Sequence, residues 1–156
     1  MTDLPSSALE LRLSRHLAAP RMAVWRCWSE PELMKQWFTP RPWTTPVIET
    51  DFRPGGGSFI LMRGPNGEEH ENHGVYLEID PGRRLVFTDA YRAGWLPSPK
   101  PFFTAILTFD DEGDGTRYTA TARHWRLEDK TMHEEMGFHD GWGKATDQLE
   151  ALAQKV

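Results

Sequence analysis

The sequence predicts an α+β domain in which one curved antiparallel sheet of seven strands wraps around a long C-terminal helix, with two short helices between the first two strands. Three observations support this fold class. Short apolar runs separated by turn residues fill most of the chain, an apolar stripe at helical spacing ends it, and 13 glycines and 12 prolines are spread throughout. A single antiparallel sheet buries an apolar face by packing on a helix or by curling, so we expect both.

Residues 1–7 are expected to form a disordered tail and residues 8–156 a single domain, because a chain of 156 residues suits one hydrophobic core. The segment 9–17 alternates apolar and polar side chains with a period of two, which predicts a half-buried first strand. Aromatic residues make up 12% of the chain, including seven tryptophans, which is far too many for an unfolded protein.

Two short helices are predicted after the first strand. Pro20 is tolerated in a first helical turn, and it precedes the helix expected over 22–28. Ser29 and Glu32 have the spacing of a capping box, in which each side chain bonds a backbone N–H at a helix start. The second helix is therefore expected to begin there and to end before Pro40.

Six further strands are predicted from apolar or alternating runs bounded by turn residues. Their ranges are 45–52, 58–63, 70–79, 84–91, 102–109 and 116–125. Alternate residues of a strand point to the same side, so Val75, Leu77 and Ile79 are expected to share one face. The segment 92–101, with three prolines, is expected to be a loop.

The C-terminal part of the chain changes to a helical period. Thr131 and Glu134 have the spacing of a second capping box, from which the long helix is expected to start. Its apolar stripe consists of Phe138, Trp142, Ala145, Leu149, Leu152 and Val156. Gly141 and Gly143 each cost about 1 kcal/mol relative to alanine inside a helix. They predict that another part of the molecule approaches this turn closely.

Charge and composition argue against several classes of protein. The net charge is -5, without a basic block, which argues against nucleic-acid binding. No apolar run is long enough for a membrane-spanning helix, and the N-terminus lacks the pattern of a signal peptide. The single cysteine, Cys27, cannot form an internal disulfide and is expected to be a buried, inert thiol. We therefore expect a cytoplasmic protein that does not bind membranes.

Several short motifs occur in a fixed order along the chain. They are Ala19-Pro20, Val24-Trp25, Glu30-Pro31-Glu32, Trp37-Phe38-Thr39-Pro40, Asp51-Phe52-Arg53-Pro54-Gly55-Gly56, Gly74-Val75-Tyr76-Leu77-Glu78-Ile79-Asp80-Pro81, Arg84-Leu85-Val86-Phe87-Thr88, Gly115-Thr116 and Gly141-Trp142. In these motifs the chain resembles the family related to the C-terminal domain of the activator of Hsp90 ATPase, the AHSA1-like family. This family belongs to the START-like (SRPBCC, helix-grip) superfamily, and the resemblance spans about residues 9–153.

The resemblance implies the helix-grip fold with an internal cavity open to small apolar ligands. It implies less about activity, because bacterial-type members of the family mostly have no assigned reaction. The family name comes from a eukaryotic relative that stimulates a chaperone, and this chain is expected to be the domain alone, without the additional N-terminal domain of such a co-chaperone. The leading hypothesis is therefore a non-enzymatic carrier or sensor that binds a small hydrophobic ligand, a lipid or an aromatic metabolite.

Side chains that this topology would point inward are expected to line the cavity, since ligand sites are mainly apolar with a few polar groups. The predicted ligand-binding residues are Trp37, Phe38, Phe59, Leu61, Tyr76, Phe87, Tyr91, Phe103, Trp125, Phe138, His139 and Trp142. The alternative for any single ring is ordinary core packing. The alternative for His139 is a boundary histidine bonded to a backbone carbonyl or to water.

Two other functions stay open. The first is an enzyme of cyclase or hydrolase type that uses the same cavity, where burial would shift the pKa values of acid–base groups. Its candidate groups are Asp89, Tyr91, Arg123 and His139. The second is a chaperone-interacting protein that binds through its outer surface. Exposed sheet edges and surface tryptophans such as Trp43 and Trp95 also suggest a homodimer.

The histidines do not match a known metal motif. His70 and His73 are an odd number of residues apart, so on one strand they point to opposite faces. His133 and His139 are six residues apart, whereas a zinc-protease helix needs two histidines four apart. The segment 55–58 matches neither a nucleophile elbow nor a phosphate-binding loop. We expect no metal and no cofactor.

Overall fold

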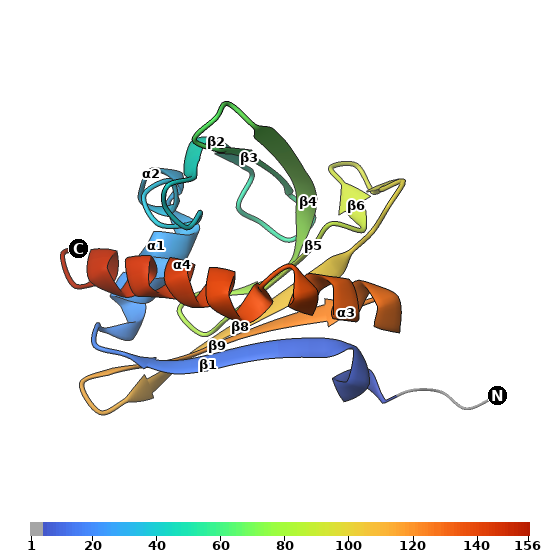
Figure 1. Cartoon of the computed structure of the whole chain (residues 1–156). Coiled ribbons are helices and arrows are strands. Elements are labelled where there is room, and N and C mark those ends of the chain that lie inside the picture. Colours follow the sequence, from blue (N-terminus) through green and yellow to red (C-terminus); the bar gives the residue numbers. More distant parts are fainter. Residues whose placement is uncertain (1–4) are drawn as a thin grey trace.

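A computed structural model describes residues 5–156 of the chain (Figure 1). Seven strands form one antiparallel sheet in the order β1-β9-β8-β5-β4-β3-β2, which confirms the predicted sheet. These strands are β1 (Glu10–Leu17), β2 (Thr44–Thr50), β3 (Gly57–Arg63), β4 (Glu69–Asp80), β5 (Arg84–Thr88), β8 (Phe103–Glu112) and β9 (Gly115–His124). A separate two-stranded hairpin consists of β6 (Tyr91–Arg92) and β7 (Leu96–Pro97).

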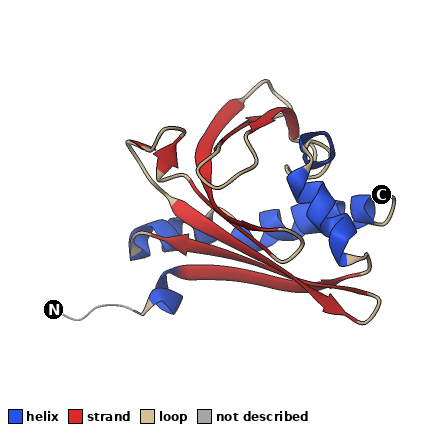
Figure 2. Cartoon of the chain, turned by 180° about the vertical axis from the view of Figure 1, so that it is seen from behind, coloured by secondary structure: helices blue, strands red, loops and turns tan. Residues whose placement is uncertain are grey.

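The helices cover one side of the sheet. They are η1, one turn of 3-10 helix (Ser6–Leu9), α1 (Arg21–Ser29), α2 (Pro31–Met34), α3 (Leu127–Glu135) and α4 (Phe138–Ala153). In Figure 1, α4 lies along β1, β9 and β8, while β4, β3 and β2 bend up beyond it. The view from behind shows strands of the sheet crossing in front of the long C-terminal helix (Figure 2). The predicted long C-terminal helix and the two short helices between β1 and β2 are confirmed.

Alternation along the strands gives the sheet an inner face toward α4 and an outer face. On β9, for example, Tyr118 and Ala120 are buried in one cluster with Ala145 and Leu149 of α4, whereas Thr119 between them lies on the outer face. The buried members of this main core cluster are Leu17, Ala19, Ala23, Val24, Trp25, Cys27, Trp28, Met34, Trp37, Ile48, Ile60, Tyr76, Leu85, Leu107, Phe109, Tyr118, Ala120, Ala145, Leu149 and Ala153.

A β-bulge in β4 corrects the predicted face of Leu77. The register with β5 shifts between Tyr76 and Glu78, so one extra residue stands on β4 at this point. Tyr76 and Ile79 therefore both belong to the main core cluster, while Leu77 is exposed. Strict alternation, which would place Val75, Leu77 and Ile79 on one face, fails because the bulge resets the pattern.

Both predicted capping boxes are wrong. Ser29 is the last residue of α1, and no side chain caps α2; Glu30 instead pairs with Arg26, with Nε 2.7 Å from Oε2. Thr131 and Glu134 lie inside α3, a separate helix that the sequence pattern merges with α4. Gly137 has a left-handed backbone (φ 97°) and divides the two helices.

Two segments predicted to be irregular contain regular structure. Residues 1–4 of the predicted tail lie outside the described part of the chain, and residues 6–9 form η1. The predicted loop 92–101 contains most of the β6–β7 hairpin, and the strand that starts at Arg84 ends at Thr88 rather than at Tyr91.

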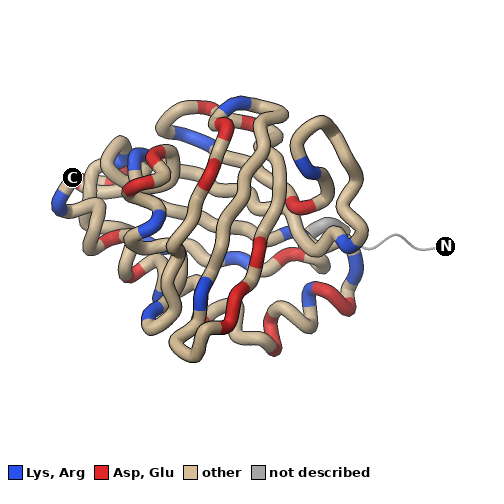
Figure 3. Tube along the Cα trace, turned by 90° about the horizontal axis from the view of Figure 1, so that it is seen from above, with Lys and Arg blue, Asp and Glu red and all other residues tan. Residues whose placement is uncertain are grey.

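Positions of Lys and Arg are interspersed with positions of Asp and Glu along the Cα trace, as the view from above shows (Figure 3). Many of them pair: Arg15 lies 2.6 Å from Asp147, and Arg117 lies 2.8 Å from Glu112. Such exposed pairs contribute little to stability, typically below about 1 kcal/mol each. Within residues 5–156, no helix combines the length and the apolar character that crossing a membrane requires.

Candidate functional site

The deepest part of the interior is a group of rings around α1. We call Trp25, Trp28, Trp37, Phe109 and Tyr118 the α1 ring cluster; all five are buried. The rings of Trp28 and Trp37 lie 4.9 Å apart in an edge-to-face contact. Their indole groups are also satisfied, since Trp28 Nε1–H donates to the Tyr118 hydroxyl (3.2 Å) and Trp37 Nε1–H donates to the Cys27 carbonyl (2.9 Å). This cluster therefore has the properties of a packed core.

Four bulky side chains on the inner face are only partly buried. We call Phe38, Met62, Phe87 and Trp142 the inner rim; they come from the segment after α2, from β3, from β5 and from α4. All four pack against the main core cluster, and the rings of Phe38 and Phe87 lie 5.9 and 5.8 Å from that of Trp28. The inner rim is thus an apolar surface that solvent still reaches.

A second group of rings lies where α3 meets the sheet. We call Phe102, Phe103, Phe138 and Trp142, with the imidazoles of His124 and His133, the α3 ring cluster. The His133 ring lies 5.1 Å from Phe102, 5.3 Å from Phe103, 5.2 Å from Phe138 and 6.0 Å from Trp142, measured between ring centroids. Trp142 therefore belongs to both the inner rim and the α3 ring cluster.

Two buried histidines form the polar part of the α3 ring cluster. His124 and His133 are 2% and 8% exposed, and His124 Nε2 lies 2.8 Å from His133 Nδ1. His124 Nδ1 lies 2.8 Å from the Leu9 carbonyl oxygen. Burial, with a smaller contribution from His124, lowers the pKa of His133 from 6.5 to about 4. The His133 imidazole is therefore neutral at physiological pH.

Asp89 holds the chain that enters the α3 ring cluster. Its carboxylate accepts hydrogen bonds from the backbone N–H groups of Phe102 (2.9 Å) and Phe103 (3.2 Å). Burial raises the pKa of Asp89 above its ordinary value, and the two N–H donors oppose part of that rise. This carboxylate therefore has a positioning role for Phe102 and Phe103.

Seven of the twelve predicted ligand-binding residues lie in the interior rings. They are Trp37, Phe38, Tyr76, Phe87, Phe103, Phe138 and Trp142. Phe59 and Leu61 have a different place, because on β3 it is Ile60 and Met62 that belong to the main core cluster; alternation puts Phe59 and Leu61 on the outer face.

The other three predicted residues lie at the surface. Tyr91 is 39% exposed and packs against Trp95 of the hairpin, with ring centroids 5.8 Å apart. Trp125 is 49% exposed just after β9. His139 is exposed as well, 3.9 Å from Glu134. Ligand binding by the seven residues that face inward stays a prediction. The other five lie on the outer face or at the surface.

The predicted convergence of Asp89, Tyr91, Arg123 and His139 does not occur. Arg123 lies on the outer face of β9 because its neighbours Ala122 and His124 are buried, and it pairs with Glu10 at 2.7 Å. Tyr91 and His139 are exposed on separate elements, in the hairpin and on α4. With Arg123 on the outer face and Tyr91 and His139 exposed, the four groups do not meet in one interior site.

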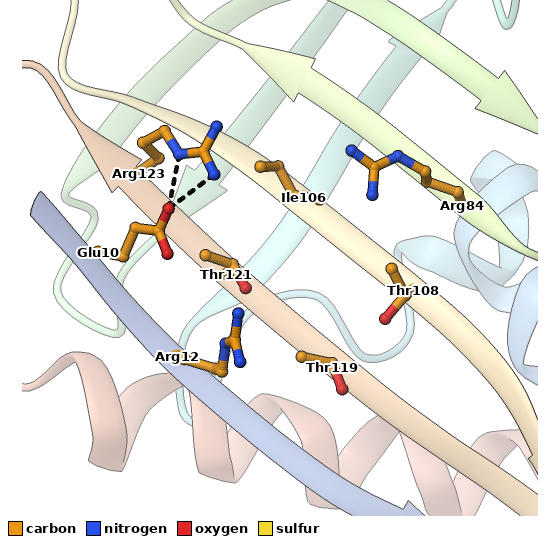
Figure 4. A pocket seen from close by; sticks show the side chains of 8 residues that line it. All are labelled: Glu10, Arg12, Arg84, Ile106, Thr108, Thr119, Thr121 and Arg123. Atoms are coloured by element: carbon orange, nitrogen blue, oxygen red, sulfur yellow. Dashed lines mark hydrogen bonds and ion pairs between the residues drawn. The ribbon is translucent and has the colours of Figure 1, made fainter. Parts of the chain in front are cut away.

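A pocket of about 340 Å³ lies on the outer face and is mostly polar. Its lining residues are Glu10, Arg12, Arg84, Ile106, Thr108, Thr119, Thr121 and Arg123 (Figure 4). Two of its three arginines are paired, Arg123 with Glu10 and Arg84 with Glu78. A second pocket, of about 430 Å³, lies between α2 and the start of β2. None of the predicted ligand-binding residues lines either pocket, so the internal cavity stays a prediction.

The remaining reactive side chains have ordinary surroundings. His70 lies opposite Met62 and stacks on Trp43, whereas His73 lies opposite Phe59, so the two histidines face opposite sides as predicted. Cys27 is buried, and burial raises the pKa of its thiol to about 11. In the part of the chain that the structure describes, no three His, Cys, Asp or Glu side chains are placed to hold a metal ion.

The pairing of His124 with His133 was not predicted from the sequence. One signal was available, since His124 has the same strand parity as Tyr118, Ala120 and Ala122, all of which face inward. No comparable signal existed for His133, because it contacts His124 only after α3 folds back over β9.

Comparisons with known proteins place the chain among structures of the same fold. The family model described as Activator of Hsp90 ATPase homolog 1-like protein matches residues 18–154. The crystal structure of a protein from Nitrosomonas europaea is 40% identical with a TM-score of 0.93, and 97% of each chain is covered. A crystal structure from Mycobacterium smegmatis is 26% identical with a TM-score of 0.80, covering 97% of this chain and 95% of that one. A solution structure from Arthrobacter aurescens is 23% identical with a TM-score of 0.82, covering 99% and 91%. Among curated proteins no match was found.

Proposed function

Because the chain belongs to the activator of Hsp90 ATPase homologue 1-like family, we propose that it binds a small hydrophobic ligand, a lipid or an aromatic metabolite, on the inner face of its sheet. Its role would be that of a carrier or sensor. The binding surface would be the inner rim, with the rings of the main core cluster beneath it. The fold is consistent with ligand binding.

One observation carries this proposal. Phe38, Met62, Phe87 and Trp142 come from four separate elements, face the same interior and remain partly exposed. Apolar side chains that only completed a core would gain most by full burial, about 25 cal/mol for each Å² removed from water. A guest molecule that covers the inner rim would supply that missing burial. Met62 is unbranched and flexible, so it suits a surface that adjusts to a guest.

The direct test is native mass spectrometry of the protein purified from its own host. We expect an additional mass that organic solvent releases as a lipid or aromatic molecule. Absence of such a mass, together with no change in melting temperature across a library of apolar compounds, would contradict the proposal.

A matched pair of variants locates the site. Met62 and Leu61 are neighbours on β3 and are both half-buried, but Met62 faces inward and Leu61 outward. Met62→Gln places an amide in the apolar site and should weaken ligand binding about tenfold, whereas Leu61→Gln should leave it unchanged. Equal effects of the two changes would mean that the ligand does not contact the inner face.

A second candidate function is supported by a different observation. An acid–base enzyme of cyclase or hydrolase type needs titratable groups within hydrogen-bond reach inside the protein, and the buried His124 and His133 lie 2.8 Å apart. In that case a co-purified ligand would change mass on prolonged incubation with the wild-type protein, and His133→Phe would stop the change. A ligand that is released unaltered after incubation would favour the carrier or sensor.

A further inference from the structure

The His124–His133 pair joins three parts of the chain. His124 comes from β9 and His133 from α3, and the carbonyl oxygen that His124 contacts belongs to Leu9 of η1. Both contacts are 2.8 Å long, which is a good hydrogen-bond length. The three groups therefore form one chain of hydrogen bonds, from Leu9 through His124 to His133.

The Leu9 carbonyl fixes the position of one proton in this chain of hydrogen bonds. A carbonyl oxygen only accepts, so His124 Nδ1 must be the protonated nitrogen that donates to Leu9. When His124 carries a single N–H, its Nε2 has a lone pair and accepts from His133 Nδ1–H. His133 Nε2 is then left with a lone pair and no proton.

The lone pair of His133 Nε2 has no partner among residues 5–156. No hydrogen bond from the described residues reaches this atom, whereas His133 Nδ1 is bonded to His124. No side-chain nitrogen or oxygen of the described residues is both fully buried and unpartnered. The described residues leave His133 Nε2 without a hydrogen bond, although the His133 side chain is buried among Phe102, Phe103, Phe138 and Trp142.

The surroundings of this atom define what it would recognise. A single hydrogen-bond acceptor beside four aromatic rings matches the composition of a small-molecule site, which is mostly apolar with a few placed polar groups. The acceptor selects a molecule with a hydroxyl or N–H group, because a bound molecule without a donor would leave His133 Nε2 covered and unpaired, which costs free energy. A carboxylate offers no donor at neutral pH and would place negative charge against a lone pair.

We propose that His133 Nε2 is the polar recognition point of the ligand site and accepts a hydrogen bond from a hydroxyl or N–H group on an otherwise apolar, ring-containing small molecule. This inference rests on the proposed function, and it names the ligand class for the same site, since Trp142 belongs to both the inner rim and the α3 ring cluster. It favours an aromatic alcohol or phenol over a fatty acid. His124 is a positioning residue, because it fixes the tautomer of His133.

The test compares two probes that differ in one hydrogen-bond donor. 2-Naphthol carries a hydroxyl, and 2-methoxynaphthalene has the same ring system without the donor. By calorimetry, the wild-type protein should bind 2-naphthol about tenfold more tightly than the ether. His133→Phe should bind both probes with equal affinity, because phenylalanine keeps the ring and removes the acceptor. His139→Phe is the matched control and should keep the preference, because His139 is exposed.

A second measurement uses only the wild-type protein and therefore tests the proposal even if His133→Phe fails to fold. Nitrogen-15 NMR of the wild-type imidazoles at pH 7 should show a protonated Nδ1 on both His124 and His133. The His133 Nε2 resonance should shift on addition of 2-naphthol and stay unchanged with the ether. A protonated His133 Nε2 in the ligand-free protein would overturn the inference.

The failures of the two proposals are distinguishable. Equal affinity of wild type for 2-naphthol and its ether overturns the role of His133 and leaves the proposed function standing. If dodecanoate binds and neither naphthyl probe binds, the inference is also overturned and a lipid ligand is supported instead. Binding of none of the three probes overturns the inference and removes the support for the proposed function.

Discussion

The two ring clusters are built from the same kinds of residue but differ in how their polar atoms are satisfied. In the α1 ring cluster, Trp28 and Trp37 are buried and both indole N–H groups donate to protein acceptors. In the α3 ring cluster, Phe103 and Trp142 are only partly buried, and His133 Nε2 has no partner among the described residues. Aromatic content alone therefore does not separate a packed core from a candidate binding surface. The hydrogen-bond partners of the polar atoms distinguish the two.

The largest expected effect tests this difference in packing. Trp28→Ala should lower the free energy of unfolding by about 4 kcal/mol, because it opens a cavity in a buried cluster and leaves the Tyr118 hydroxyl without its donor. Trp142→Ala should cost roughly half as much, because Trp142 is only partly buried. Urea unfolding followed by circular dichroism measures both.

The control for this pair is Trp125→Ala, which removes an exposed tryptophan and should change stability by less than about 1 kcal/mol. Equal losses for Trp28→Ala and Trp142→Ala would mean that both clusters are packed to the same degree. The distinction between core and candidate site would then fail.

The next effect concerns the polar part of the α3 ring cluster. Burial lowers the pKa of His133 to about 4 in the folded protein, against 6.5 when unfolded. Between these pH values the unfolded chain binds more protons than the folded protein. The free energy of unfolding therefore has its full value above pH 6.5 and decreases as the pH falls toward 4. The contribution of this one group is about 3 kcal/mol.

Unfolding by urea at intervals between pH 7.5 and pH 4.5 measures this dependence. His133→Phe is expected to be less stable at neutral pH but to show a shallower loss on acidification, since it cannot take up the proton. His139→Phe should keep the wild-type slope, because His139 is exposed. A wild-type slope in His133→Phe would mean that other groups cause the acid sensitivity.

Features that depend on local periodicity were predicted from the sequence. The seven strands, the two short helices and the long C-terminal helix all follow from alternation or from the apolar stripe, and each is found, although β5 ends at Thr88 and the long helix starts only at Phe138. The features that were missed depend on single backbone events. The bulge at Leu77 reverses a face, and Gly137 divides one expected helix into α3 and α4.

The candidate site was predicted only in part, for a physical reason. An excess of rings indicates an apolar interior, and seven predicted residues do lie there. Which rings stay half-buried depends on how α4 and the segment after α2 sit over the curved sheet, and that is a tertiary property. The contact between His124 and His133 needs α3 to lie over β9, which no spacing in the sequence expresses.

The smallest expected effect tests the packing beside Trp142. The sequence predicted that a neighbour approaches Gly141 closely, but a Cβ atom added there would meet no atom within 4 Å. Gly141→Ala should therefore raise the stability of the ligand-free protein by about 0.5–1 kcal/mol, the ordinary gain inside a helix. Gly137→Ala is the control, and it should lower stability by roughly 1–2 kcal/mol because its backbone is left-handed (φ 97°).

Thermal unfolding of both variants, with and without a bound ligand, makes this comparison sharp. A gain in the free protein that disappears when ligand is bound would place the guest in the open space next to Gly141, beside the α3 ring cluster. A loss in the free protein would mean that this space is already filled. In that case the α3 ring cluster would be as tightly packed as the α1 ring cluster, and the difference between them would lie in the partners of their polar atoms.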